Sequence, residues 1–248
     1  MLKKLLVILL ILPFVSYNNV LSFGGKTHYQ ITRSAIINTK LLDHFPIEHR
    51  KKLKCDLLKS CNFPDNDTSS YITGFYSHFF NPDKGFDGLE EKDFTLINLR
   101  GNAFTSMYAD YLEAKELWRK GNQFESIDKL GRSIHYMQDM CCIAHEMNWK
   151  DNIKFFLSGQ HVRYENIIND YISINFYNFL DTYKDFDFRK VQNVGSVAVS
   201  MSSLLKSKFI DKYRSGNIDT PDIEEIGIAH KATCKLIYLF FKEVGIEL

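Results

Sequence analysis

The sequence predicts an all-α protein, a single multi-helix bundle interrupted by one long irregular loop. Apolar residues recur mostly at the i, i+3, i+4 and i+7 spacing of amphipathic helices, and alternating strand patterns are weak. The 248 residues include only 5 prolines and 13 glycines, so turn signals are few and long helices are favoured. Neither an internal repeat nor a low-complexity linker divides the chain, and one domain is therefore the simplest organisation.

Thr27 and Pro46 suit the starts of the first two predicted helices, and Gly101, Gly121 and Gly216 lie near the boundaries of later ones. Helices are expected at residues 27–42, 46–61, 100–120, 123–142, 160–182, 188–214 and 221–245. Residues 62–99 form the long irregular stretch. A loop of this length inside a compact domain is usually functional or held in place by another group.

The first 22 residues are predicted to be a secretory signal peptide rather than part of the fold. Lys3 and Lys4 precede an apolar run at 5–15 that is shorter than a membrane span. Cleavage after Ser22 would leave Phe23 as the first residue of a domain at 23–248. Cleavage after Ser16 and an uncleaved anchor helix are the alternatives. We therefore expect a secreted protein, extracellular or periplasmic.

Charge and cysteine content narrow the function classes. The formal net charge of +1 disfavours a nucleic-acid binder that relies on a large basic face, although it is compatible with a local basic patch. Export permits disulfides, but five cysteines is an odd number, so one thiol must stay free or pair between molecules. The neighbours Cys141 and Cys142 are expected to be core thiols or part of a disulfide, and an extra soft metal ligand is the alternative.

Two histidine–carboxylate pairs recur at helical spacing. His135 and Asp139 are four residues apart, so both side chains leave one helix face about one turn apart. Such a pair is more often a surface ion pair than a metal site, but His161 and Glu165 repeat it on another predicted helix. His145 can join the first pair only if its helix ends or bends before it.

Further candidate ligands lie upstream, at Asp65 and His78 in the irregular stretch and at His28 near the first helix start. Imidazole and carboxylate together favour zinc or a similar transition ion over calcium. The candidate histidine and carboxylate ligands would suffice for three metal ions if Asp139 bridged two of the ions and the amine and carbonyl of Phe23 supplied two more contacts. The remaining histidines stand among charged or small residues and are expected at surface or capping positions: His44, His49 and His230.

These motifs resemble the zinc-dependent prokaryotic phospholipase C family, which comprises the phosphatidylcholine-preferring enzyme and the catalytic domain of clostridial alpha-toxin. The family's His-Tyr-x-x-Asp, with a later His and Asn, is matched by His135, Tyr136, Asp139, His145 and Asn148. Its second pair is matched by His161, Tyr164, Glu165 and Asn166, and its Pro-Asp and His-Phe by Pro64-Asp65 and His78-Phe79.

The resemblance implies three zinc ions and hydrolysis of a phospholipid by metal-activated water, which releases diacylglycerol and a phosphorylated headgroup. One zinc would take Phe23, His28 and Asp139; the second Asp65, His78, His135 and Asp139; the third His145, His161 and Glu165. Asp65 would also orient the attacking water or take its proton. We expect a monomer that meets its substrate at a membrane surface and has no stable nucleic-acid partner.

Some features depart from the family pattern or leave alternatives open. Phe23 occupies a position where the family has a tryptophan, and Ile143 one where it has a proline. The spacing from Phe23 to His28 resembles that of the fungal-type single-strand zinc nucleases. A zinc nuclease and a non-catalytic metal-binding relative are therefore the alternatives. The substrate-binding residues are not predicted, because the loop aromatics can hold a choline ammonium, stack on a base or simply pack the loop: Tyr71, Phe75, Tyr76, Phe79 and Phe80.

Overall fold

Helices form all the regular secondary structure in the part of the chain that the computed structural model describes, residues 24–66, 75–84, 102–146 and 158–248. The all-α prediction is confirmed. The signal-peptide prediction for residues 1–22, Phe23, Tyr71 and Asn148 lie outside the described residues. The long helices are α2 (Gly24–Asn38), α3 (Ile47–Ser60), α5 (Ala103–Arg119), α6 (Gln123–Asp139), α8 (Gln160–Tyr183), α9 (Val194–Arg214) and α10 (Ile223–Glu243).

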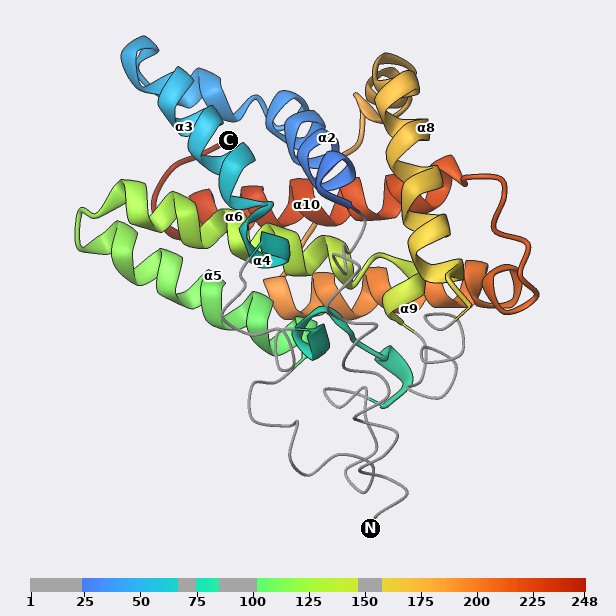
Figure 1. Cartoon of the computed structure of the whole chain (residues 1–248). Coiled ribbons are helices and arrows are strands. Elements are labelled where there is room, and N and C mark those ends of the chain that lie inside the picture. Colours follow the sequence, from blue (N-terminus) through green and yellow to red (C-terminus); the bar gives the residue numbers. More distant parts are fainter. Residues whose placement is uncertain (1–23, 67–74, 85–101, 147–157) are drawn as a thin grey trace.

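Helix α6 lies at the centre of the bundle (Figure 1). It pairs with α5 and packs against α3 and α10. Each residue from Ser133 to Asp139 is buried, including the polar ones. Because burial of polar groups costs free energy unless they are paired or bind an ion, the second half of α6 requires partners from neighbouring elements.

Close contact between α3 and α6 depends on Gly131. A Cβ atom on this residue would stand 2.1 Å from Oγ of Ser60 and 3.0 Å from the backbone nitrogen of Cys61. Both distances are below ordinary van der Waals contact, so only glycine lets the two helices approach this closely. The approach brings the end of α3 against the polar half of α6.

The predicted helix boundaries were correct for the second helix and wrong in detail for others. The first helix ends at Asn38 because Lys40 adopts a left-handed conformation (φ 52°), and a separate turn, η1 (Leu41–His44), follows. The helix predicted from residue 188 begins at Val194, because the side chain of Asn193 caps it by accepting a hydrogen bond from Ser196 N–H (2.8 Å). Thr27 lies inside α2 rather than at its start.

The stretch 62–99 was predicted to be irregular, but its described parts form short helices. These are α4 (Phe63–Asn66), η3 (Phe75–His78) and η4 (Pro82–Lys84). Asp65 and His78 therefore project from turns of helix, which lie against α6.

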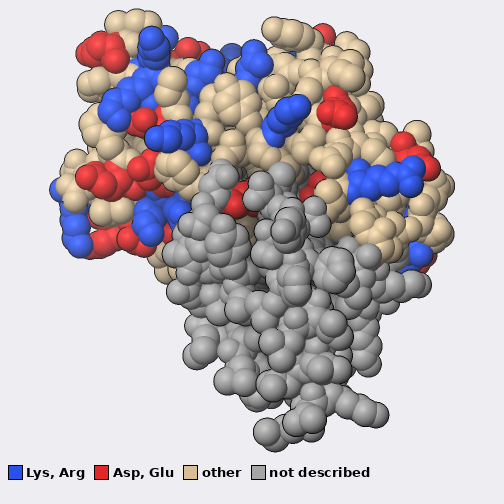
Figure 2. Space-filling view, viewed as in Figure 1, with Lys and Arg blue, Asp and Glu red and all other residues tan. Residues whose placement is uncertain are grey.

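Two surface properties bear on function. Lys and Arg side chains are interspersed with Asp and Glu on the described part of the face in Figure 2, in keeping with the near-zero net charge. Among the described helices, none combines the length and apolarity that a bilayer crossing requires.

Candidate metal centre

Helix α6 presents His135 and Asp139 on one face, as their spacing predicted. His135 Nε2 lies 3.2 Å from Oδ2 of Asp139, and both side chains are fully buried. The helix was predicted to continue to residue 142, but it ends at Asp139. The early end allows the chain to turn back, which was the condition for His145 to reach the site.

The turn that carries His145 forms without the proline of the family pattern. Cys142 N–H donates to the carbonyl of Asp139 (2.9 Å), and His145 N–H donates to that of Cys142 (2.8 Å). Ile143 N–H, which a proline would lack, donates to Oε1 of Glu225 in α10 (3.2 Å). The buried Glu225 carboxylate thus fixes the turn η5 (Ile143–His145), a role that sequence reasoning missed.

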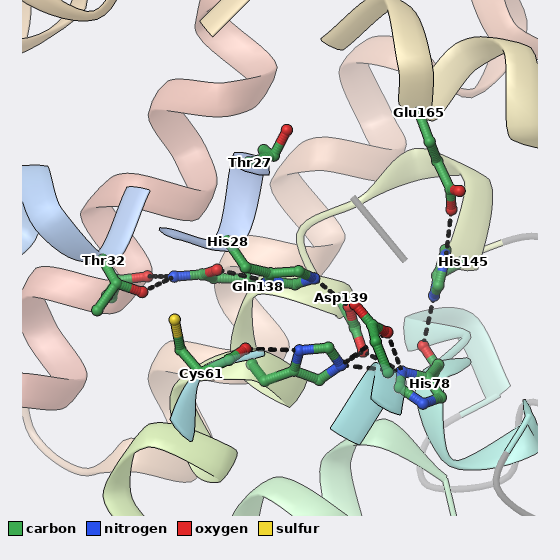
Figure 3. A network of polar contacts seen from close by, with 12 residues as sticks. Thr27, His28, Thr32, Cys61, His78, Gln138, Asp139, His145 and Glu165 are labelled. Carbon is green, nitrogen blue, oxygen red and sulfur yellow. Dashed lines mark hydrogen bonds and ion pairs between the residues drawn. The ribbon is translucent and has the colours of Figure 1, made fainter. Parts of the chain in front are cut away.

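Asp139 is the point at which side chains from separate elements meet (Figure 3). His28 Nε2 from α2 lies 3.4 Å from its Oδ1, and His78 Nδ1 from η3 lies 2.7 Å from its Oδ2. Asp65 from α4 completes this part, with Oδ1 3.5 Å from His135 Nε2 and 4.0 Å from His78 Nδ1. Ligand types that are far apart in sequence therefore converge on one buried carboxylate.

A second cluster joins η5 to α8. His161 Nε2 lies 2.8 Å from Oε1 of Glu165, and His145 Nε2 lies 3.4 Å from the same oxygen. All three residues are buried. The second i, i+4 pair is therefore not a surface ion pair but an interior group with one acidic and two imidazole members.

The eight predicted side-chain ligands fall into three groups in which the candidate ligand atoms lie within 4.8 Å of one another. The first two groups share His135, and each of the three contains a carboxylate. They are His28, His135 and Asp139; Asp65, His78 and His135; and His145, His161 and Glu165. Cys141 and Cys142 are in none of them.

Backbone carbonyls hold two of the histidines in the tautomer that metal binding requires. His135 Nδ1 donates to the carbonyl of Cys61 (2.9 Å), and His145 Nδ1 donates to that of His78 (2.8 Å). Because a carbonyl can only accept, the proton sits on Nδ1 in both rings. Each Nε2 is left with a lone pair that points into the site, and this arrangement is typical of metal-ligating histidines.

Electrostatics in the Asp139 cluster favour a cation. Burial alone would raise the pKa of Asp139, but its interactions with the imidazoles of His135 and His78 hold this pKa well below its usual range. Burial alone would lower the pKa values of His28 and His78, but Asp139 outweighs it and raises both. His28 Nε2 is too far from Oδ1 of Asp139 for a well-formed hydrogen bond, so this buried oxygen is left for another cation.

The third group is short of positive charge. Burial lowers the pKa of His161 to about 4, so its imidazole is neutral near pH 7. Burial raises the pKa of Glu165 to about 7, which means that its ionised form lacks adequate compensation. Two imidazoles and a carboxylate that needs a cation form a donor set that fits a transition-metal ion.

Other histidine and cysteine predictions had mixed outcomes. His44 and His49 are exposed as expected. The surface or capping position expected for His230 is wrong, because this ring is fully buried beside Phe179. Its Nε2 accepts a hydrogen bond from Asn38 Nδ2 (3.0 Å), and burial lowers its pKa to about 3. All five cysteines are free, and Cys141 and Cys142 lie in the core, so the core interpretation is confirmed and the disulfide one is wrong.

Aromatic residues of the irregular stretch pack against the site. The ring of Phe79 stacks on His145 with centroids 4.7 Å apart, and Phe80 is part of the core. For Phe80 the packing interpretation is confirmed, whereas Phe79 is partly buried against a candidate metal ligand. Tyr71 and the side chains of Phe75 and Tyr76 lie outside the described residues.

Comparisons with known proteins support the family resemblance. No family model matches the chain. The chain is 29% identical over 129 residues to a phospholipase C of Paraclostridium bifermentans. The alignment covers 46% of this chain and 28% of that protein. The chain is 24% identical over 156 residues to a phospholipase C of Clostridium haemolyticum, which covers 58% and 37%. These alignments thus span about a third of the curated relatives' length.

Solved structures show the same fold. The alpha-toxin of Clostridium absonum superposes with a TM-score of 0.63 at 21% identity, over 88% of this chain and 64% of the toxin. An alpha-toxin of Clostridium perfringens from avian strain SWCP gives 0.64 at 20% identity, over 88% and 63%. The predicted resemblance to the clostridial phospholipase C family is therefore confirmed, and the helical fold is that of the alpha-toxins over these residues.

Proposed function

We propose that the chain is a zinc-dependent phospholipase C, which hydrolyses a phospholipid to diacylglycerol and a phosphorylated headgroup. The observation that carries this proposal is the buried carboxylate of Asp139, which lies within 3.4 Å of imidazole nitrogens from three separate elements. Similarity to two proteins named phospholipase C supports the lipid substrate over a nucleic acid.

Three zinc positions fit the donor set. The first would use His28 and Asp139 together with the amine and carbonyl of Phe23, and the third would use His145, His161 and Glu165. The second would use Asp65, His78, His135 and Asp139. Bound there, zinc supplies Lewis acidity, which offsets charge on phosphoryl oxygens and makes water a better nucleophile near neutral pH.

Asp65 is the proposed catalytic residue. Its Oδ1 faces the nitrogens of His78 and His135, so its carboxylate is at the inner wall of the cluster. A carboxylate in this position can accept a proton from the attacking water or fix its direction. Because a ligating carboxylate is a weak base, orientation of the water is the main contribution that we assign to it.

We further propose that the protein is secreted after cleavage behind Ser22, that it acts as a monomer and that it meets its substrate at a membrane surface. Cleavage at this position would create the Phe23 amine that the first zinc position needs. N-terminal sequencing of exported protein tests this directly. A different first residue would remove Phe23 from the ligand set.

The activity is tested with zinc-loaded protein and phosphatidylcholine vesicles. We expect release of diacylglycerol and phosphocholine, which a chelator abolishes and added zinc restores. Asp65→Asn is expected to lower kcat by about 100-fold. The matched control is Asp110→Asn, which alters a partly buried aspartate of α5 that pairs with Lys129 (3.2 Å) and belongs to none of the three ligand groups. Its activity should stay near that of the unaltered protein.

Other substrates separate the alternatives. Release of nucleotides from single-stranded DNA or RNA, without lipid hydrolysis, would support a zinc nuclease instead. A fully metal-loaded protein that is inert on phospholipids and on nucleic acids would support a non-catalytic metal-binding protein. Either result would overturn the phospholipase C proposal.

A further inference from the structure

Gln138 is buried in the middle of the cluster, although the family motif leaves its position unspecified. It follows His135 and precedes Asp139 on α6, and none of its surface is exposed. Its Oε1 lies 2.6 Å from Nδ1 of His28. Its Nε2 donates to the hydroxyls of Thr32 (3.0 Å) and Thr233 (3.1 Å). The contact to His28 joins α6 to α2, and the contact to Thr233 joins it to α10.

The orientation of the Gln138 amide follows from Thr233. The Thr233 hydroxyl donates its single proton to the carbonyl of Ala229 (2.8 Å), so it can only accept from Gln138. The atom that faces Thr233 must therefore be the NH₂ group of the amide. As a consequence, the atom that faces His28 is the carbonyl oxygen, which can only accept.

His28 consequently carries its proton on Nδ1. In the neutral ring, Nε2 keeps a lone pair and faces Asp139 at 3.4 Å. The ring is also held by stacking on His135, with centroids 4.2 Å apart and planes 28° from parallel (Figure 3 shows the Gln138 contacts). His28 differs in this respect from His135 and His145, whose tautomers are set by backbone carbonyls.

We propose that Gln138 is a positioning residue that selects the metal-binding tautomer of His28, with Thr233 fixing the amide in the required direction. The inference rests on the proposed metal centre but concerns this chain's own side chains. Gln138 does not contact the metal and acts through His28. Partners of this kind typically change metal affinity by about 10- to 100-fold when they are removed.

Direct evidence for the tautomer comes from nitrogen NMR of zinc-loaded protein with ¹⁵N-labelled histidine. We expect a proton on Nδ1 of His28 and metal coordination at Nε2. A proton on Nε2 would overturn the inference whatever the variants show. This measurement needs no substitution, so it does not depend on whether a variant folds.

Metal titration of variants provides the second test. Gln138→Met keeps the approximate size but lacks an acceptor, and it should weaken one of three zinc affinities by about 10- to 100-fold with the other two unchanged. Gln138→Glu restores an acceptor and should recover most of that loss. Thr233→Val should weaken the same zinc several-fold, because the amide loses its fixed direction. Gln123→Met, at the exposed start of α6, is the control and should change nothing.

The outcomes separate this inference from the proposed function. Unaltered protein that binds no zinc would contradict the metal centre itself. Unaltered protein that binds three zinc ions, with Gln138→Met and Thr233→Val equal to it, would overturn only the role of Gln138. Equal weakening of all three zinc affinities in a folded Gln138→Met variant would also overturn it, because that pattern indicates general damage to the core.

Discussion

Replacement of Gly131 by alanine tests whether the α3–α6 contact supports the metal centre. The added methyl would stand 2.1 Å from Oγ and 2.7 Å from Cβ of Ser60, and 3.0 Å from the backbone nitrogen of Cys61. Rotation of the serine can relieve only the first contact. The other two require the end of α3 to move away from α6 by several tenths of an ångström.

The expected loss of stability can be worked from this overlap. Overpacking of a well-packed interface costs about 1–3 kcal/mol, and alanine in place of glycine in a helix returns about 0.5–1 kcal/mol. The difference between these ranges is about 0–2.5 kcal/mol. Its midpoint, about 1.3 kcal/mol, corresponds to a decrease in Tm of about 3–5 °C for a chain of this size. Thermal unfolding of metal-free Gly131→Ala, followed by circular dichroism, measures this decrease.

The same movement should weaken zinc binding. The carbonyl of Cys61 accepts the Nδ1 proton of His135 at 2.9 Å, so displacement of residue 61 lengthens that hydrogen bond. Loss of such a partner costs about 10-fold or more in metal affinity. Gly195→Ala is the control, because its added methyl has no described neighbour closer than 3.5 Å. Unchanged Tm and unchanged zinc affinity in Gly131→Ala would refute the reasoning.

Three further perturbations follow from the centre. Asp139→Asn keeps the shape of the side chain but removes its charge. The variant should keep zinc only at His145, His161 and Glu165, and its phospholipid hydrolysis should fall by about 100-fold or more. Metal analysis that finds three ions in the variant would contradict this expectation. Zinc affinity should fall as the pH is lowered from about 7 to about 5, because protons compete for His28 and His78, whose pKa values are raised, and calorimetry in that range checks the sign. Burial raises the pKa of Glu225 to about 7, so its contribution to stability is fully present below the unfolded value of 4.5 and is lost as the pH rises through 7. Metal-free Glu225→Gln should therefore gain up to about 3 kcal/mol on the unaltered protein between about pH 4.5 and 8, and denaturant unfolding with no such relative gain would exclude the buried ionisation.

Local spacing was enough to predict the two i, i+4 pairs. His135 with Asp139 and His161 with Glu165 lie within single helices, and their relative positions depend only on helix geometry. Their neighbours in space could not be obtained in this way. The placement of His28 and His78 around Asp139 depends on the packing of α2 and η3 on α6 and was reached only through the family resemblance.

The errors have physical causes that can be read from the residues. His230 was expected at the surface because Ala229 and Lys231 flank it, but Ile226, Cys234 and Ile237 lie four or seven residues away and define a buried helix face. The early end of α6 was missed because no glycine or proline marks it. Its turn is fixed instead by Glu225, which is far away in the sequence.

The role of Gln138 could not be predicted from local sequence either. Its importance comes from contacts with His28 and Thr233, which are 110 and 95 residues away in the sequence. No local pattern distinguishes this glutamine from one on a helix surface. Buried amides next to predicted ligands are therefore worth testing once a fold is known.

Anomalous scattering at the zinc edge, from crystals of the zinc-loaded protein, tests the central claim most directly. We expect three peaks: one beside His28 and Asp139, one among Asp65, His78, His135 and Asp139, and one among His145, His161 and Glu165. Asp139 should contact the first two ions. The account would be contradicted if protein saturated with zinc showed no anomalous peaks at these positions, or showed peaks only at surface histidines such as His44 and His49.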